Sequence, residues 1–142
     1  MNTLNQLLSG KGHEIWSIGP NDSVYDAIHL MAEKGIGALV VLDDKAVVGI
    51  ISERDYARQV ILKDRSSKGT MVKDIMSADV ICADPQQTVD ECLALMTEKR
   101  FRHLPVMDGD QMLGLVSMGD LVKTIIAEQK ETIDQLEHYI TG

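Results

Sequence analysis

The sequence predicts an α/β (α+β) protein with two tandem β-α-β-β-α repeats related by pseudo-twofold symmetry, followed by a C-terminal helix. The first observation is an internal duplication: residues 20–56 and 85–121 align without a gap at a constant offset of 65, as for Pro20 and Pro85. The second is that apolar residues change from a helical to a strand period at the same places in both copies. Two such copies usually bury their apolar faces against each other, so the cleft between them is the first place to look for a site.

Each copy begins with a short extended segment, residues 14–18 or 79–83, and a proline two residues later ends it. A helix follows in each copy after a hydroxyl residue, Ser23 or Thr88. A carboxylate lies three positions further on, which is the pattern of a capping box. Apolar residues then recur at i, i+3, i+4 and i+7, so both segments are predicted to be amphipathic helices.

Two apolar runs around Asp/Gly turn residues follow each helix and predict a β-hairpin. The expected strands span residues 38–42 and 47–51 in the first copy, and residues 104–107 and 112–116 in the second. A second helix is expected to start at Ser52 and at Ser117, which completes the β-α-β-β-α unit.

The chain is expected to divide into four parts. Residues 1–62 form the first repeat with an N-terminal lead-in helix, residues 63–70 a polar linker, residues 71–127 the second repeat, and residues 128–142 a C-terminal helical extension. The apolar face of the last helix continues to Ile140, beyond its repeat. A second subunit is a reasonable candidate to cover that face.

Composition excludes several classes of function. The net charge of −8 and the lack of a basic block argue against a nucleic-acid partner. No apolar run approaches the roughly 18 residues that span a bilayer, and the N-terminus lacks the pattern of a secretory signal. We therefore expect a cytoplasmic protein that does not bind membranes. Cys82 and Cys92 are interpreted as small buried residues, and the histidines show no metal-ligand spacing with them, so no metal site is expected.

The sharpest local pattern is Gly-φ-φ-Ser-x-x-Asp (φ apolar), found at residues 49–55 and 114–120. One interpretation is structural: the serine caps the helix and the aspartate completes a capping box. The other is functional, because free amides at a helix start attract phosphate and an aspartate suits the two hydroxyls of a ribose. The pattern alone leaves both interpretations open.

The ordered set of motifs resembles a CBS-domain pair. It comprises Pro-x-x-Ser/Thr-Val before each first helix, Arg102-His-Leu-Pro-Val106 at the start of a strand, and Gly-φ-φ-Ser-x-x-Asp at the end of each unit. The resemblance covers about residues 12 to 127. It implies a homodimer that binds an adenosyl ligand (AMP, ADP, ATP, NAD or S-adenosylmethionine) in the clefts between repeats, and that regulates a partner protein without catalysis or a catalytic cofactor.

The resemblance also implies two sets of nucleotide-binding residues. The first cleft would use Ser17, Ile18, Gly37 and Ala38 with Ser117 and Asp120. The second cleft would use Ile81, Cys82, Arg102, His103, Leu104 and Pro105 with Ser52, Arg54 and Asp55. The two aspartates would hold ribose hydroxyls; the phosphate contacts would be Ser52, Ser117, Arg54, Arg102 and His103. Arg102 and His103 could instead be a solvated cation and a satisfied histidine.

Two other functions compete with this interpretation. The protein could be a dimeric interaction scaffold of the same fold whose clefts bind nothing. It could also be an enzyme, but no nucleophile-base-orienter set, Walker-type loop or metal cluster can be assembled from the sequence. We therefore expect no catalysis.

Overall fold

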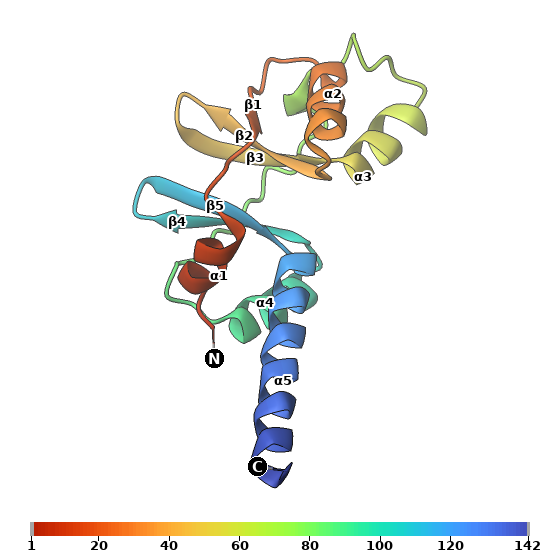
Figure 1. Ribbon diagram of the computed structural model, residues 1–142. Coiled ribbons are helices and arrows are strands. Elements are labelled where there is room, and N and C mark those ends of the chain that lie inside the picture. The colour runs from red at the N-terminus through yellow and green to blue at the C-terminus, as the bar shows by residue number, and fades with distance from the viewer. Residues whose placement is uncertain (1, 142) are drawn as a thin grey trace. The chain divides into compact units, whose positions relative to one another are not determined.

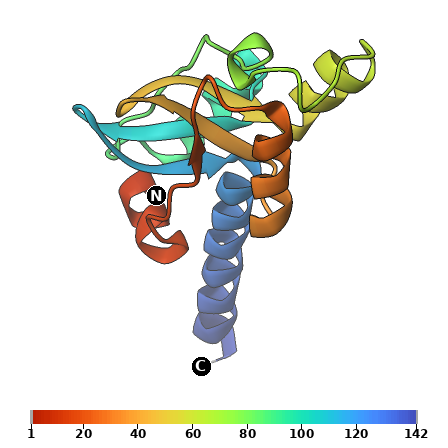
Figure 2. The same cartoon turned by 90° about the horizontal axis from the view of Figure 1, so that it is seen from above.

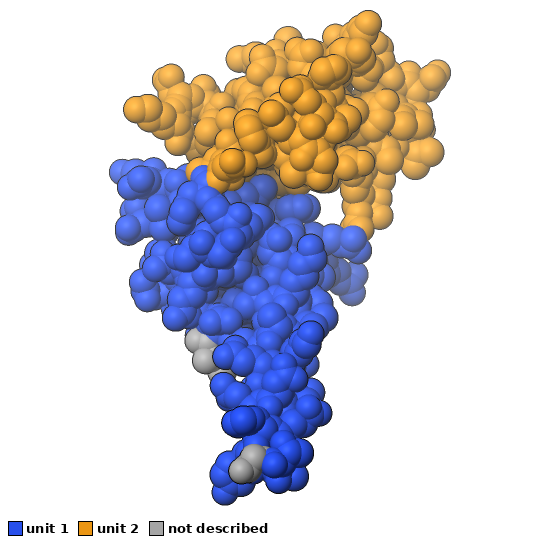
Figure 3. Space-filling view, viewed as in Figure 1, with its two compact units in different colours: residues 1–13, 82–142 blue, residues 14–81 orange. Residues whose placement is uncertain are grey.

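The computed structural model of the protein describes residues 2–141 and confirms a mixed α/β fold with two small sheets (Figure 1). The chain divides into two compact units, coloured separately in Figure 3. Unit 1 contains residues 1–13 and 82–142, and unit 2 contains residues 14–81. Each unit holds one of the two repeats.

Unit 2 contains a three-stranded sheet in the order β1-β2-β3. Strand β1 is parallel to β2, and β2 and β3 form the predicted antiparallel hairpin. Its elements are β1 (Ser17–Ile18), α2 (Val24–Lys34), β2 (Ala38–Asp43), β3 (Ala46–Ser52), α3 (Glu53–Tyr56), a π-helical segment (Ala57–Ile61) and a 3₁₀ turn (Val72–Asp74). Val24, Met31, Leu39 and Ile51 are among the fully buried side chains of its core.

Unit 1 repeats this arrangement with a two-stranded sheet. Its elements are α1 (Leu4–Lys11), α4 (Val89–Lys99), β4 (His103–Asp108), β5 (Gln111–Ser117) and α5 (Met118–Thr141). The pairing of the β4–β5 hairpin shifts between Val106 and Met107, at the same repeat position as the shift between Val41 and Leu42 in unit 2. The duplication is therefore preserved down to an irregularity in the ladder.

The lead-in segments are exchanged between the repeats. Helix α1 precedes the first repeat in the chain but packs on the second, where Leu4 N donates to Gln87 O at 2.9 Å (Figure 1 and Figure 2). The segment before the second repeat packs on the first in the same way, with Val72 N donating to Asp22 O at 2.9 Å. The expected boundaries grouped α1 with residues 14–62, whereas the compact units place it with residues 82–142.

A pair of equivalent glycines makes this exchange possible. A Cβ at Gly114 would lie 2.8 Å from Leu8 of α1, and a Cβ at Gly49 would lie 2.5 Å from Sδ of Met76. Both glycines lie on the second strand of a hairpin, under the lead-in segment that covers it. The repeated Gly-φ-φ-Ser pattern thus has a packing reason at its first position.

Several local expectations need correction. The first strand of repeat one is only Ser17–Ile18, and in repeat two it is reduced to a single parallel bridge between Ala83 and Val106. Ser23 and Thr88 do cap their helices by accepting a backbone hydrogen bond. The reciprocal bond to the cap's backbone is not formed at either, so neither is a complete capping box. No helix within residues 2–141 is long and apolar enough to cross a membrane.

Candidate functional site

The Ser-x-x-Asp pattern of repeat one forms a closed hydrogen-bond unit at the start of α3. Ser52 is the N-cap, and its Oγ accepts from Asp55 N at 3.2 Å. Oδ2 of Asp55 accepts from Ser52 N at 2.9 Å and from Ser52 Oγ at 3.0 Å. The structural interpretation of this motif, a capping box, is confirmed here.

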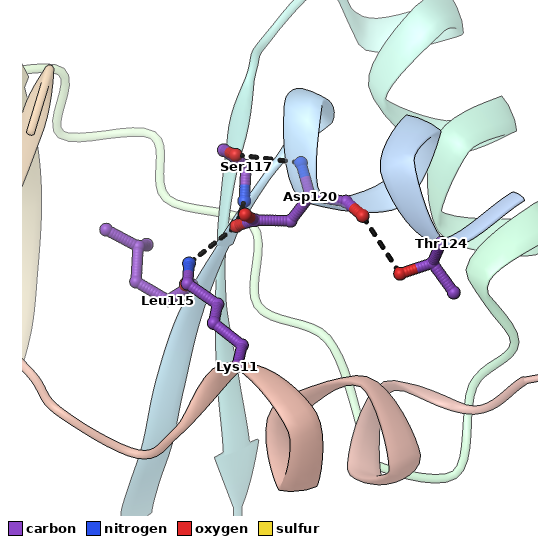
Figure 4. A network of polar contacts seen from close by, with 5 residues as sticks. All are labelled: Lys11, Leu115, Ser117, Asp120 and Thr124. Atoms are coloured by element: carbon purple, nitrogen blue, oxygen red, sulfur yellow. Dashed lines mark hydrogen bonds and ion pairs between the residues drawn. The ribbon is translucent and has the colours of Figure 1, made fainter. Parts of the chain in front are cut away.

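The equivalent pattern in repeat two carries an additional cation (Figure 4). Ser117 N donates to Oδ2 of Asp120 at 2.8 Å, and Asp120 N donates to Oγ of Ser117 at 3.1 Å, which repeats the arrangement of Ser52 and Asp55. Lys11, at the end of α1, donates from Nζ to Oδ2 of Asp120 at 2.5 Å and to the carbonyl oxygen of Leu115 at 2.7 Å. The next turn of α5 is held by a hydrogen bond from Thr124 Oγ1 to Asp120 O at 3.0 Å.

This ion pair determines the charge state of Asp120. Partial burial raises the pKa of the carboxyl group, but hydrogen bonds from Lys11 and Ser117 and the positive charge of Lys11 outweigh that effect. The net result is a pKa below the ordinary value, so Asp120 is ionised at neutral pH. Within residues 2–141, Asp55 has no such ion pair.

Each aspartate keeps one oxygen available. In both motifs the capping interactions use Oδ2, as does the Lys11 ion pair, so these contacts leave Oδ1 unoccupied. A carboxylate oxygen can accept two hydrogen bonds. Oδ1 can therefore accept a hydrogen bond from a ligand hydroxyl while Oδ2 keeps the helix cap. The structural and functional interpretations of Ser-x-x-Asp are therefore compatible.

The family to which these motifs belong is decided by comparison with known proteins. The family model of the CBS domain matches the chain twice, over residues 12–61 and 72–127. The chain belongs to the CBS domain family. The two matches correspond to the two repeats, and the chain therefore contains a CBS pair.

Relatives match the chain over nearly its whole length. The CBS domain-containing protein CBSX3, mitochondrial, of Arabidopsis thaliana is 39% identical over 99% of this chain and 72% of its own. The solved structure of a protein with CBS domains from Burkholderia ambifaria MC40-6 is 56% identical, with a TM-score of 0.86 over 90% of this chain and 96% of its own.

One solved CBS pair was determined in complex with adenosyl ligands. The CBS domain pair of protein MJ0100, in complex with 5′-methylthioadenosine and S-adenosyl-L-methionine, superposes with a TM-score of 0.80 over 90% of this chain and 98% of its own. Because only 21% of residues are identical, this similarity concerns the fold.

The site residues predicted in CBS repeat one lie at one end of its hairpin. Ser17 and Ile18 form β1 and pair with Val40 and Val41 of the neighbouring strand. Ala38 pairs with Ser52, and the carbonyl oxygen of Gly37 accepts from Glu53 N at 3.0 Å. The structure therefore brings Gly37 and Ala38 beside the start of α3. Arg54 is exposed on the first turn of that helix.

The site residues predicted in CBS repeat two follow the same plan. His103 pairs with Ser117, and the carbonyl oxygen of Arg102 accepts from Met118 N at 2.8 Å. The Leu104 side chain belongs to the core of unit 1, so only its backbone could meet a ligand. Ile81 and Cys82 are exposed, which corrects the expectation that Cys82 is buried; Cys92 is buried as expected.

Lys11 is the site residue that sequence analysis missed. It lies 109 positions from Asp120, outside both repeats, and no spacing rule connects the two. The only signal was its place in the Gly10-Lys-Gly12 segment after an amphipathic stretch. Lys11 and Asp120 line a groove of about 460 Å³ between α1 and α5, which is also lined by Lys123 and Thr124. Within unit 1, the Asp120 carboxylate is thus open to small molecules.

Proposed function

We propose that this protein is a non-catalytic regulatory module that binds an adenosyl ligand (AMP, ADP, ATP or NAD) in the clefts between its two CBS repeats. Occupancy would be signalled to a partner protein. The observation that carries this proposal is the pair of Ser-x-x-Asp motifs, in which each aspartate retains an unused carboxylate oxygen. Two hydroxyls on adjacent ribose carbons are suitable donors to such a group.

Each proposed cleft takes its strand residues from one repeat and its Ser-x-x-Asp motif from the other. In the first cleft, Asp120 would hold ribose while Gly37 and Ala38 let the adenine lie close to the backbone. In the second cleft, Asp55 would hold ribose, and Arg54, Arg102 and His103 would meet phosphate. The adenosyl ligands bound to the CBS pair of MJ0100 support this ligand class.

Signalling needs only that two states of the module differ in their affinity for the nucleotide. If the partner-competent and partner-incompetent states of the module bind the nucleotide with different free energies, occupancy shifts the balance between them. The homodimer expected from the sequence is part of this proposal. Solved relatives that assemble, such as the hexameric CBS-CP12 protein of bloom-forming cyanobacteria, support an oligomer.

The test is calorimetric titration of the purified protein with AMP, ATP, NAD and S-adenosylmethionine. The decisive variant is Asp55→Asn/Asp120→Asn, because an asparagine oxygen can still cap the helix while its amide group replaces the free acceptor. We expect saturable binding by the wild type and at least tenfold weaker binding by the variant, which is about 1.4 kcal/mol. Ser23→Ala is the matched control, because it removes an N-cap that has no proposed ligand contact.

A folded protein that shows neither heat nor thermal stabilisation with any of the four nucleotides would overturn the proposal. The alternative would then be a CBS-fold interaction scaffold without a ligand. One observation favours that alternative specifically: the long, exposed apolar face of α5. Unchanged binding in the double variant would instead show that the two aspartates do not hold the nucleotide.

A further inference from the structure

Helix α5 extends well past the unit to which it belongs. Its first half packs on unit 1 through Leu121 and Ile125, and Glu128 accepts a hydrogen bond from Asn2 N. From Gln129 to Thr141 every residue is exposed, and Figure 1 shows this half running beyond α1 and α4. An isolated helix of this length is marginal in water. The second half continues a packed helix but gains no burial within unit 1, so a partner on its apolar face would stabilise it.

Helix α5 carries a continuous apolar seam that starts in its first half and runs through the exposed half; it is defined here by positions 122, 126, 129, 133, 136 and 140. Successive positions are separated alternately by four and three residues, the spacing that pairs one helix with another. Five of the six are large and apolar, with exposed fractions between 39% and 81% (Val122, Ile126, Ile133, Leu136 and Ile140). The sixth, Gln129, is polar.

We propose that this seam packs against the seam of a second copy of the chain, with the two α5 helices antiparallel. The proposal specifies the surface of the homodimer included above, and it needs no nucleotide. Isoleucine occupies every second seam position (126, 133 and 140), so large apolar side chains recur along the whole seam. In the antiparallel register each Val122 would meet Ile140 of the other copy, so both seams are covered along their full length.

Charge supports the antiparallel orientation. Lys123 and Glu137 flank the seam on the same side, near its opposite ends. An antiparallel pair puts Lys123 of each copy against Glu137 of the other, which gives two attractive contacts on either side of one repulsive contact between the two Lys130 side chains. A parallel pair would keep Lys123 and Glu137 at opposite ends, so neither attractive contact could form; the acidic residues Glu131 and Asp134 lie on the outer face of the helix in either orientation. The same acidic residues disfavour an anionic membrane surface as the occupant, because interfacial helices are rich in lysine and arginine.

The experiment is sedimentation of the full chain over a range of concentrations, without nucleotide. We expect a dimer for the wild type and at least tenfold weaker association for Ile133→Glu. Ile133 is exposed within the subunit, so this variant should keep the fold of the monomer, which circular dichroism would verify. Gln135→Glu is the matched control, because it adds the same charge on the opposite face of α5 and should leave the dimer intact.

Charge exchange tests the orientation. Lys123→Glu and Glu137→Lys should each weaken the dimer, and the double variant should restore it. A monomeric wild type would overturn the proposal and leave the seam to a different protein. A dimer that survives Ile133→Glu would show that another surface is used, and charge variants without effect would overturn the antiparallel pairing. All these outcomes are independent of whether nucleotides bind.

Discussion

Lys11 and Asp120 are joined by an ion pair that ties the N-terminal helix to the start of the C-terminal helix, although 109 residues separate them in the chain. The same ammonium group also donates to the carbonyl oxygen of Leu115. Lys11 therefore holds α1 on the second repeat at two points (Figure 4). The equivalent aspartate of the first repeat, Asp55, has no ion pair among residues 2–141.

Replacing Lys11 by methionine should lower the free energy of unfolding by about 1 kcal/mol or less at pH 7, because the pair is partly exposed and solvent screens it. The effect should depend on pH. Since the folded-state pKa of Asp120 lies below its usual value of 3.8, its charge stabilises the fold above that value. This contribution is lost as the pH falls through the folded-state pKa.

Urea unfolding of wild type and Lys11→Met at pH 7 and at pH 3 measures this difference. The difference in the free energy of unfolding between the two proteins should be smaller at pH 3 than at pH 7. Part of it should remain, because Lys11 also donates a hydrogen bond to Leu115 O. Lys45→Met is the control, because Lys45 is exposed and makes no ion pair with residues 2–141. If the difference in the free energy of unfolding does not change with pH, the ion pair does not stabilise the packing of α1.

The two proposed clefts should differ in their affinity for the nucleotide. Oδ2 of Asp120 already carries a cation, and Gly119 stands where the first repeat has Arg54. If the proposed clefts bind nucleotide, single substitutions should separate them: Asp55→Asn and Asp120→Asn should each remove one class of site from a titration, with unequal dissociation constants. Equal effects of the two variants would contradict this asymmetry.

The equivalent glycines under the lead-in segments should not tolerate alanine equally. At Gly49 a Cβ would lie 2.5 Å from Met76 Sδ and 2.9 Å from the backbone oxygen of Ser77, which is itself paired with Ile50. At Gly114 the obstacle is the end of the Leu8 side chain, which can shift. Gly49→Ala should therefore cost about 1 to 3 kcal/mol, in the range of overpacked cores, and Gly114→Ala should cost less.

Thermal or urea unfolding of the two variants checks this order. Gly10→Ala serves as the control: apart from its chain neighbours and the backbone of its own helix, nothing lies within 4 Å of the added Cβ, and alanine is preferred to glycine inside a helix. It should be neutral or slightly stabilising. A Gly114→Ala variant less stable than Gly49→Ala would mean that α1 is held more rigidly than its contacts suggest.

Most of the fold could be predicted because local signals and the duplication agree. Both hairpins, the helices after Ser23 and Thr88, and the helix starts at Ser52 and Ser117 lie where the sequence places them. Turn residues and caps act within a few positions, so a single sequence shows them. Comparison of two copies removes much of the remaining ambiguity.

The exchanged lead-in helices could not be predicted in the same way. Residues 4–8 and 72–76 show an amphipathic pattern, but a pattern does not reveal which repeat will cover it. The exchange depends on backbone bonds such as Leu4 N to Gln87 O, between segments far apart in the chain. Lys11 was missed for the same reason, since its two partners lie more than 100 residues away.

The two cysteines should differ in reactivity, and one should report on the proposed second cleft. Cys92 is buried on α4, where burial and the negative charge of Glu91 raise its pKa to about 11. Cys82 is exposed, and partial burial of its thiol raises its pKa less. Because the thiolate is the reactive form, iodoacetamide at pH 8 should modify Cys82 slowly and Cys92 only after unfolding.

Mass spectrometry of the alkylated peptides measures both rates. If Cys82 lines the second cleft, a saturating nucleotide should slow its alkylation several-fold, and Asp55→Asn should abolish that protection at the same nucleotide concentration. Asp120→Asn is the matched control, because it alters the other proposed cleft and should leave the protection in place. Equal Cys82 rates with and without a nucleotide known to bind would place the ligand away from residues 81–82.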